Sequence, residues 1–303
     1  MERSRSARSV AVIVTTVDDS LEPRVSKPHI SFSQMSMYLR CSMQYYFRYI
    51  LGIKDPPKLP LAIGKGGHAA LEFNGRYKMK NGVDLAVPDM LDMASTFIDL
   101  ESEELENTSP NEKGEAKDRA IAALRVYQTR DAAAITPAGV EIEFNLDIND
   151  PAEENVEPIR IVNGKIDIIT TDVTVLDYKF VGRARSQGEV DLSPQLTLYG
   201  KVFRVLTGKY PKNTGYQMFL PGSTRTPPDA RALFRDPSLM RPRQQEARFQ
   251  RLRYQFQQVE RGIRTGVFIP TDDAQTCSWC GYRDRCQSSL VSDYEAAKIR
   301  GET

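Results

Sequence analysis

The spacing of apolar side chains changes twice along the chain. From about residue 33 to 134 they recur every three or four positions, from Pro137 they alternate with polar residues, and after residue 194 the helical spacing returns. These periods are typical of amphipathic helices and of half-buried strands. The pattern predicts helices over 33–50, 88–106, 115–134, 194–206 and 240–264, a helix that starts at the Gly-rich segment 64–72, and strands over 140–148, 159–169, 173–180 and 216–220.

Helices before and after a meander of three strands predict an α/β (α+β) fold with one central sheet. Residues 1–29 are rich in Ser, Arg and Val, lack a period and end in two prolines, so we expect a flexible N-terminal tail. We expect a single domain over 30–290, with 84–134 as a helical insertion and 291–303 as a C-terminal tail.

The composition is that of a globular chain with a locally uneven charge. Of the 303 residues 40% are hydrophobic, and the formal net charge is only +1. Any surface for a polyanion must therefore come from local segregation of charge. The longest apolar run near the N-terminus, 10–14, is far too short to span a membrane, so we expect a cytoplasmic protein.

The segment 241–264 is the most basic part of the chain, whereas 84–118 is acidic. Arginines in this predicted helix alternate with Phe249, Tyr254 and Phe256. Guanidinium groups pair with backbone phosphates and aromatic rings stack on the bases of a single strand, so the helix is a candidate DNA surface. The alternative is that its polar residues only solvate one face of an amphipathic helix.

Acidic residues mark two neighbouring strands, in Gly164-Lys-Ile-Asp167 and in Asp177-Tyr-Lys179. Side chains alternate along a strand, so Asp177 and Lys179 project to the same side. Asp167 and Asp177 are placed almost symmetrically about a turn near 171–172, so antiparallel pairing would set them opposite each other. Two facing carboxylates suit Mg²⁺ or Mn²⁺, and a neighbouring ammonium can orient or activate a water. The alternative, an ion pair on a solvated strand, conflicts with the apolar residues around it.

Four motifs follow one another along the chain, namely Gly64-x-x-x-His68, Gly164-Lys-Ile-Asp167, Asp177-x-Lys179 and Gln195-x-x-x-Tyr199. Over roughly residues 31–290 this series resembles the RecB-like nucleases of the PD-(D/E)xK superfamily. The resemblance implies a restriction-endonuclease-like core, in which helices flank a central mixed sheet.

The same resemblance assigns roles to individual residues. It implies that His68, Asp167 and Asp177 bind the metal, that Lys179 serves catalysis, and that Gln195 and Tyr199 support the site from one helix face. The family often has a glutamate on its first strand. Glu141 and Glu143 both stand there, and the sequence leaves both as candidates.

The four cysteines form one further pattern. Cys277, Cys280 and Cys286 have C-x2-C-x5-C spacing, and Cys41 stands alone far upstream. Four thiolates in a reducing compartment suit either a tetrahedral Zn²⁺ or an iron–sulfur cluster. The layout resembles the cluster-bearing, Cas-four-like branch of the same family, which implies a [4Fe–4S] cluster that joins Cys41 to a clasp over 277–286.

The resemblance implies a metal-dependent DNA exonuclease that acts on single strands or DNA ends in phage or host recombination, repair or CRISPR adaptation. The alternative is a non-catalytic DNA-binding or adaptor subunit of a recombination or CRISPR-adaptation complex, against which Asp167, Asp177 and Lys179 argue. A Gly-x-x-x-x-Gly-Lys-Ser/Thr loop is not found in the sequence, so a helicase or recombinase would be a partner.

Overall fold

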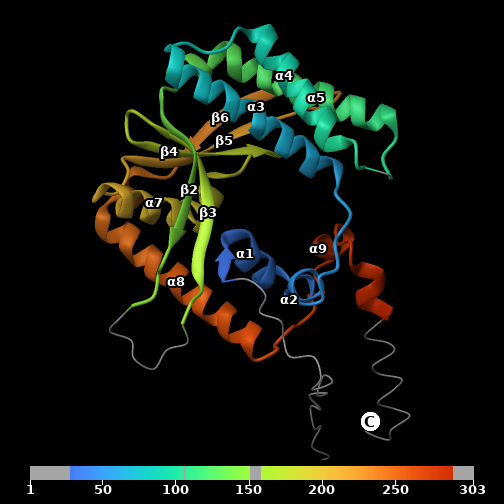
Figure 1. Ribbon diagram of the computed structural model, residues 1–303, viewed down its shortest axis with the longest axis vertical. Helices are drawn as coiled ribbons and strands as arrows, with labels where there is room; N and C mark the ends of the chain where they lie inside the picture. The colour runs from blue at the N-terminus through green and yellow to red at the C-terminus, as the bar shows by residue number, and fades with distance from the viewer. Residues whose placement is uncertain (1–27, 106, 151–157, 289–303) are drawn as a thin grey trace, which may run out of the picture.

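The computed structural model describes residues 28–105, 107–150 and 158–288, and places helices on both faces of a six-stranded mixed sheet (Figure 1). The strands are β1 (His29–Ser31), β2 (Pro137–Leu146), β3 (Ile161–Thr170), β4 (Thr174–Phe180), β5 (Asn213–Leu220) and β6 (Asp229–Phe234). The predicted α/β fold with one central sheet is confirmed. Strand β1 begins inside the segment predicted as a tail, while the remaining tail residues, 1–27 and 291–303, lie outside the described residues.

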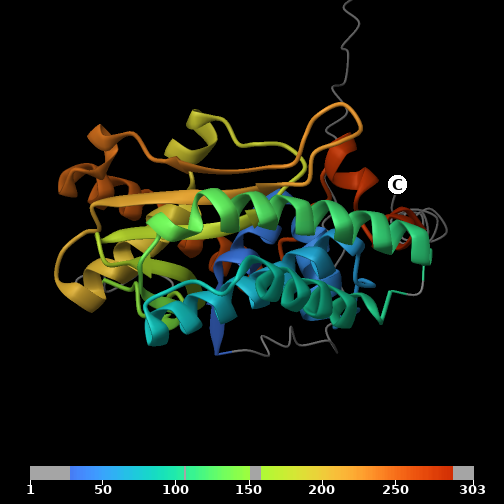
Figure 2. The ribbon, with the colours of Figure 1, turned by 90° about the horizontal axis from the view of Figure 1, so that it is seen from above.

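The helices form two layers, one on each side of the sheet. They are α1 (Phe32–Arg40), α2 (Ser42–Tyr45), the π-helix η1 (Tyr46–Ile50), α3 (Leu59–Asn81), α4 (Val87–Ser102), α5 (Pro110–Arg130), η2 (Ala132–Ala134), α6 (Gln187–Asp191), α7 (Pro194–Thr207), η3 (Pro237–Met240), α8 (Pro242–Arg264) and α9 (Ala274–Ser278). Figure 2 shows α4 and α5 lying side by side over the sheet. In the described part of the chain we find no helix long and apolar enough to cross a membrane.

Each face of the sheet has its own hydrophobic core. One core joins α3, α4 and α5 to Tyr178 and Phe219, and the other joins α1, α7 and α8 to Ile166 and Val175. Val175 and Tyr178 lie on the same strand but in different cores, as the alternation of side chains requires. Strand β4 pairs with β3 on one side and β5 on the other, so it is the buried central strand that its sequence predicted.

The glycines near His68 lie in the middle of α3 and not at its start, as the sequence had suggested. A Cβ on Gly66 would lie 2.6 Å from the Cα of Ile98 in α4, and one on Gly67 would lie 2.1 Å from the ring of Phe180 in β4. The two glycines thus let α3 pack directly on a neighbouring helix and on the sheet. This close packing places His68 above β4.

Strand β3 has one continuous and one interrupted edge. Strand β2 pairs with β3 between 162 and 170, whereas β1 occupies the other edge at 161–163 and β4 at 168–169. Among the described residues that second edge has no paired strand over 164–167. Strand β4 therefore separates from β3 at Asp167. At this point side chains of β3 can reach the backbone of β4.

Helix α8 buries most of the residues proposed for stacking on bases. Phe249 and Phe256 lie in the hydrophobic core at 4% and 0% exposure, and Arg253 is buried and donates to the carbonyl oxygen of Ile148. The prediction that these two phenylalanines stack on DNA is wrong, because the helix needs them to pack on α7 and the sheet. Tyr254 is 60% exposed and is the aromatic residue of this set that remains accessible.

Candidate active site

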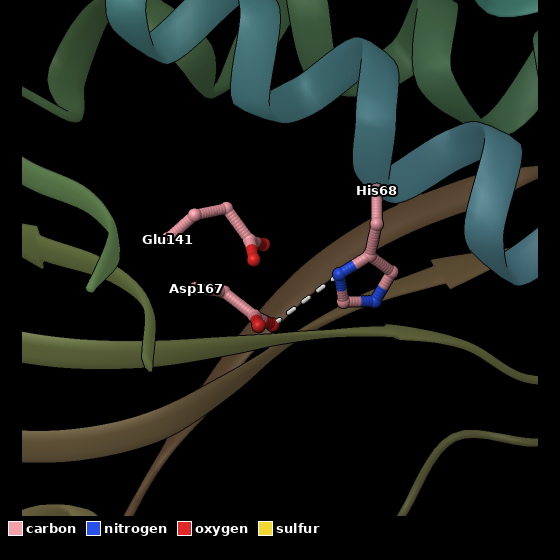
Figure 3. A group of neighbouring side chains, drawn as sticks. All are labelled: His68, Glu141 and Asp167. Carbon is pink, nitrogen blue, oxygen red and sulfur yellow. Dashed lines mark ion pairs between the residues drawn. The ribbon is translucent and has the colours of Figure 1, made fainter. Parts of the chain in front are cut away.

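Three ligand atoms converge where β2, β3 and α3 meet. His68 of α3, Glu141 of β2 and Asp167 of β3 each offer a nitrogen or oxygen, and these atoms all lie within 4.8 Å of one another (Figure 3). The Nδ1 atom of His68 lies 3.6 Å from Oδ2 of Asp167. One imidazole and two carboxylates form a donor set suited to a divalent cation.

Strand β2 is kinked at Glu141, which decides between the two candidate glutamates. Glu141 has a φ of 49°, a value in the left-handed region that non-glycine residues seldom adopt. Its register places it opposite Asp167, since Val140 pairs with Ile168 and Ile142 with Ile166. The side chain of Glu141 is 14% exposed, whereas that of Glu143 is 74% exposed and pairs with Lys165. Glu141 therefore joins the site and Glu143 does not, and such local strain is typical of functional positions.

The hydrogen bond of His68 favours the tautomer that a metal needs. The Nε2 atom lies 2.9 Å from the carbonyl oxygen of Tyr178, which can only accept, so Nε2 carries the proton. Burial lowers the pKa of His68, although the nearby Asp177 acts in the opposite direction, and the imidazole is therefore neutral at physiological pH. Its unprotonated Nδ1 then faces Asp167. A backbone carbonyl that fixes the far ring nitrogen is the usual support of a metal-binding histidine.

Asp167 and Asp177 form a buried pair of like charges. They are 7% and 2% exposed, and the register of β3 and β4 sets them opposite each other where the strands separate. Oδ2 of Asp167 accepts a 2.6 Å hydrogen bond from the backbone N–H of Tyr178. Burial and the neighbouring Asp177 nevertheless hold the pKa of Asp167 well above its usual range. A bound cation would relieve this repulsion.

Asp177 also contacts Lys179 and the following helix. Oδ1 accepts a 2.8 Å hydrogen bond from Nε2 of Gln195. Oδ2 lies 2.6 Å from Nζ of Lys179, yet no hydrogen bond of good geometry reaches this buried oxygen. Burial opposes the charged form of Lys179, but Asp177 outweighs it and the pKa of Lys179 is raised. Lys179 is thus an ammonium that forms a close ion pair with the buried Asp177 carboxylate.

Helix α7 supplies the pair predicted from the motif series. Nε2 of Gln195 donates to Asp177 and, at 3.0 Å, to the hydroxyl of Tyr199 one turn later. Tyr199 is 6% exposed, and burial together with the two aspartates raises its pKa, so it stays a neutral phenol. The structure thus brings together Asp167, Asp177, Lys179, Gln195, Tyr199 and His68. The group of atoms within 4.8 Å contains Asp167 and His68 but not Asp177.

Comparison with known proteins agrees with this geometry. Residues 29–287 match the family described as the PD-(D/E)XK nuclease superfamily. The chain belongs to this superfamily. Among solved structures it is similar to a crystal structure named "Putative exonuclease" from Eubacterium rectale, with a TM-score of 0.53 and 10% sequence identity over 88% of this chain and 91% of that chain. At this identity the likeness shows a shared fold alone, and no curated protein matches the chain significantly.

Membership of the PD-(D/E)XK nuclease superfamily supports a hydrolytic nuclease, and the mixed sheet flanked by helices confirms the restriction-endonuclease-like core. Strands β3 and β4 of this nuclease carry the acidic residues and the lysine of the motif. Glu141 is the residue that sequence reasoning left undecided. Alternation along a strand puts 141 and 143 on one face, and the sequence carries no sign of the positive φ that separates them.

The cysteines of this nuclease line one cavity of about 140 Å³ at the end of the molecule that holds α2 and α9. Burial, and to a smaller extent the three other cysteines, raise the pKa of Cys286. All four are free thiols, but among the described residues no three of their sulfur atoms lie within 4.8 Å of one another. The four cysteines share a cavity without forming the compact tetrahedron of a single ion.

Cys41 lies at a break between helices and not inside one, which corrects the predicted helix over 33–50. Its φ of −161° and ψ of 104° are extended, so it ends α1 and precedes α2. This kink faces the C-terminal segment, which is tied to the same region by hydrogen bonds from Ser42 to Ile269 and from Tyr282 to Ile53. The ring of Tyr282 also stacks on that of Phe47. Contacts outside the cysteines thus already hold the two segments together.

Proposed function

We propose that this chain is a divalent-metal-dependent DNA exonuclease of the RecB-like, Cas-four-like branch, acting on single strands or DNA ends. The observation that carries the proposal is the convergence of His68, Glu141 and Asp167 next to the Asp177–Lys179 pair. The exonucleolytic mode is inferred from the resemblance of the motif series to the RecB-like nucleases. The intact acidic and basic groups favour an enzyme over an adaptor subunit.

Mg²⁺ or Mn²⁺ fits the donor set in charge and in chemistry. His68, Glu141 and Asp167 would hold the cation. Asp177 lies outside this group and pairs with Lys179 through Oδ2, and we propose it as a further ligand. Burial and repulsion by Asp177 raise the pKa of Asp167, and burial and the nearby Glu72 raise the pKa of Glu141. A bound cation would stabilise the ionised form of both carboxylates. When bound, it supplies a Lewis acid that offsets negative charge developing on the phosphodiester.

The protein groups around this position have separate tasks. The Lys179 ammonium, held by Asp177, stabilises charge on the reacting phosphate and orients the attacking water. Gln195 fixes the orientation of Asp177 through one of its oxygens, and Tyr199 fixes Gln195 in turn. His68 is held at its far nitrogen by the backbone of the same strand that carries Lys179. The aspartate, the lysine, the histidine and the two residues of α7 are thereby preorganised for the reaction.

A basic depression beside the site supports a single-stranded substrate. A cavity of about 740 Å³ lies against the N-terminal half of α3 and is lined by Arg48, Lys54, Lys58, Lys65 and Tyr49. It does not enclose the carboxylates, but Lys65 precedes His68 by one helical turn. A second cavity of about 540 Å³ shares Arg48 with the first and extends to Trp279 beside Cys280. Cations interspersed with aromatic rings suit a strand with unstacked bases.

For the four cysteines we propose a [4Fe–4S] cluster in preference to Zn²⁺. A tetrahedral zinc ion with Zn–S bonds of about 2.3 Å would hold its sulfur atoms about 3.8 Å apart. All four cysteines line one cavity, and in a cluster each thiolate would bind a different iron. The cluster would have a structural role and join Cys41 to Cys277, Cys280 and Cys286. Thiols that stay reduced are consistent with the proposed cytoplasmic location.

The decisive experiment measures release of nucleotides from end-labelled, linear single-stranded DNA. Wild-type protein with Mn²⁺ or Mg²⁺ is expected to release them, EDTA to stop the release, and a circular single strand to resist because it has no end. Lys179→Ala is expected to lose cleavage and to retain binding, while Lys209→Ala, which removes an exposed lysine elsewhere, serves as the control. Cleavage unaffected by EDTA would refute the metal, and DNA binding without cleavage would favour the adaptor.

Iron content tests the cluster independently of cleavage. Protein purified without oxygen is expected to be brown and to carry iron with acid-labile sulfide, and the Cys280→Ser variant is expected to lose both. Zinc at one ion per chain with no iron would replace the cluster by a zinc site. We propose that the protein acts in recombination, repair or CRISPR adaptation. A helicase or a recombinase would be its partner.

A further inference from the structure

Lys179 and a second positively charged side chain lie near the same aromatic ring. Tyr216 of β5 is 4% exposed and pairs in register with Asp177 of β4. Nζ of Lys179 lies 5.5 Å from the centroid of the Tyr216 ring, and Cζ of Arg185 lies 5.3 Å from the same centroid. Both distances are within the range of cation–π attraction. Two positive groups are thus gathered on one buried ring at the edge of the proposed active site.

Arg185 and Lys179 approach this ring from the same face of the sheet. The backbone N–H of Arg185 donates to the Sδ atom of Met218, and Met218 is the residue of β5 that pairs with Lys179. Tyr216 and Met218 are two positions apart on one strand, so their side chains share a face. The hydroxyl of Tyr216 lies 2.6 Å from that of Ser193, which precedes α7 and its Gln195. Arg185 therefore lies on the side of the sheet where α7 meets Asp177.

The guanidinium of Arg185 is incompletely satisfied within the protein. Its Nε is buried and has no hydrogen-bond partner, and its Nη1 lies 3.8 Å from Glu189. That carboxylate is already bound by both terminal nitrogens of Arg183, at 2.9 and 3.2 Å, and by the backbone N–H of Ser186. A buried donor without an acceptor is unfavourable unless a ligand supplies the acceptor. The side chain remains 37% exposed, so a ligand can reach it.

We propose that Arg185 is a substrate-binding residue that donates to a backbone phosphate of the DNA strand, next to the phosphate that Lys179 contacts. This inference rests on the proposed nuclease function. A guanidinium presents its donors as a planar fork that matches the oxygens of a phosphodiester. Asp177 holds Lys179 at the reacting group, whereas no carboxylate fully engages Arg185, which leaves it to grip the neighbouring phosphate and fix the strand in place.

The test compares Arg185→Gln with Arg183→Gln, because both residues face Glu189 but only Arg185 lies on the Tyr216 ring. Binding of fluorescent oligothymidylate is measured in EDTA over a range of salt, and cleavage is measured in Mn²⁺. Arg185→Gln is expected to weaken binding about tenfold. The slope of log K against log salt should fall by about 0.7, the value for one contact to a single-stranded phosphate. KM should rise with little change in kcat, and Arg183→Gln should match wild type in all three measurements.

The outcomes separate this inference from the function on which it rests. If wild type cleaves the strand but Arg185→Gln keeps its salt slope and KM, the phosphate contact is wrong and the nuclease stands. If wild type neither binds nor cleaves, both proposals are wrong. Should the glutamine variant fail to fold, Arg185→Lys decides, since a lysine cannot reproduce the bidentate contact and an unchanged KM overturns the proposal.

Discussion

The carboxylate site and the cysteine cavity are both candidate metal sites, but the protein supports them in different ways. Asp167 and Asp177 are buried and receive hydrogen bonds from Tyr178 and Gln195, so their positions are fixed without any cation. Three of the four cysteines are half-exposed, and the thiol of Cys277 donates to the carbonyl oxygen of Thr271. The sheet fixes the first site in advance, whereas at the second site contacts outside the cysteines hold the segments together and a metal would have to bring the thiols into position.

The difference follows from where each site lies along the chain. The carboxylates stand on paired strands joined by a short turn, so pairing alone brings them together. Cys41 and the three C-terminal cysteines come from segments that are far apart in sequence, and a link between them closes a very long loop. Loss of the metal should therefore affect chemistry at the first site and stability at the second.

The largest expected effect is the loss of cleavage in Asp177→Asn. The change removes the charge that would bind the cation and hold Lys179, so the rate of single-strand cleavage should fall on the order of 10³-fold, as when one preorganised charge contact is lost. Single-turnover cleavage in Mn²⁺ measures it. Asp118→Asn, at an exposed position of α5, is the matched control. Cleavage at the control rate would exclude Asp177 from the site.

Next in size is the loss of stability in Cys41→Ser. Without one ligand the cluster should be lost, and the free energy of unfolding should fall by about 4 kcal/mol, the contribution of a ligand present at a thousandfold excess over its Kd. Thermal unfolding and iron content are measured together. After treatment with a chelator, wild type and variant should unfold at the same temperature, because neither protein then holds the cluster. A variant that unfolds like untreated wild type would leave the cysteines without a structural role.

The pH dependence of stability distinguishes the carboxylate site from the cysteine cavity. The raised pKa of Asp167 means that the folded state binds this proton more tightly than the unfolded state, so without a cation stability falls as pH rises from about 3.8 through the raised value. Asp167→Asn removes this loss and should stabilise the cation-free protein at neutral pH on the order of 2 kcal/mol. Thermal unfolding in EDTA against pH measures it.

Addition of Mn²⁺ should reverse the loss of stability and serves as the control for that experiment. The cation should raise the unfolding temperature of wild type and leave that of Asp167→Asn nearly unchanged, since it offsets a charge that the variant no longer has. Equal responses of the two proteins to Mn²⁺ would show that the cation binds elsewhere.

Sequence reasoning predicted which residues of the candidate site lie together, because their arrangement depends on local pairing. The alternation of β4 and the symmetric turn were enough to place Asp167 opposite Asp177 and Lys179 beside it, and the i, i+4 spacing placed Gln195 with Tyr199. Side-chain direction in a regular element follows from its period. These features need no knowledge of the remaining chain.

The errors arose where tertiary packing decides the local structure. The aromatic residues Phe249 and Phe256 have the same spacing whether they face DNA or a core, and the structure buries both of them in the core. The glycines before His68 suggested the start of a helix, but they serve close packing inside one. Cys41 interrupts a continuous helical pattern because it faces a segment more than two hundred residues away, and no local signal indicates this.

The smallest expected effect concerns the turn that sets the two aspartates opposite each other. Val173 has a φ of 69°, a strained value for a β-branched residue, and is 40% exposed between β3 and β4. Such strain costs about 1–3 kcal/mol, and the extra freedom of glycine in the unfolded chain offsets about 0.5–1 kcal/mol. Val173→Gly should therefore stabilise the protein by about 1 kcal/mol, with Val173→Ala between the two in thermal unfolding. Cleavage should not change, because the register of β3 and β4 is kept by Thr170 and Thr174 through their mutual hydrogen bonds. A variant that gains stability but loses cleavage would mean that strain in this turn, and not pairing alone, positions Asp167 and Asp177.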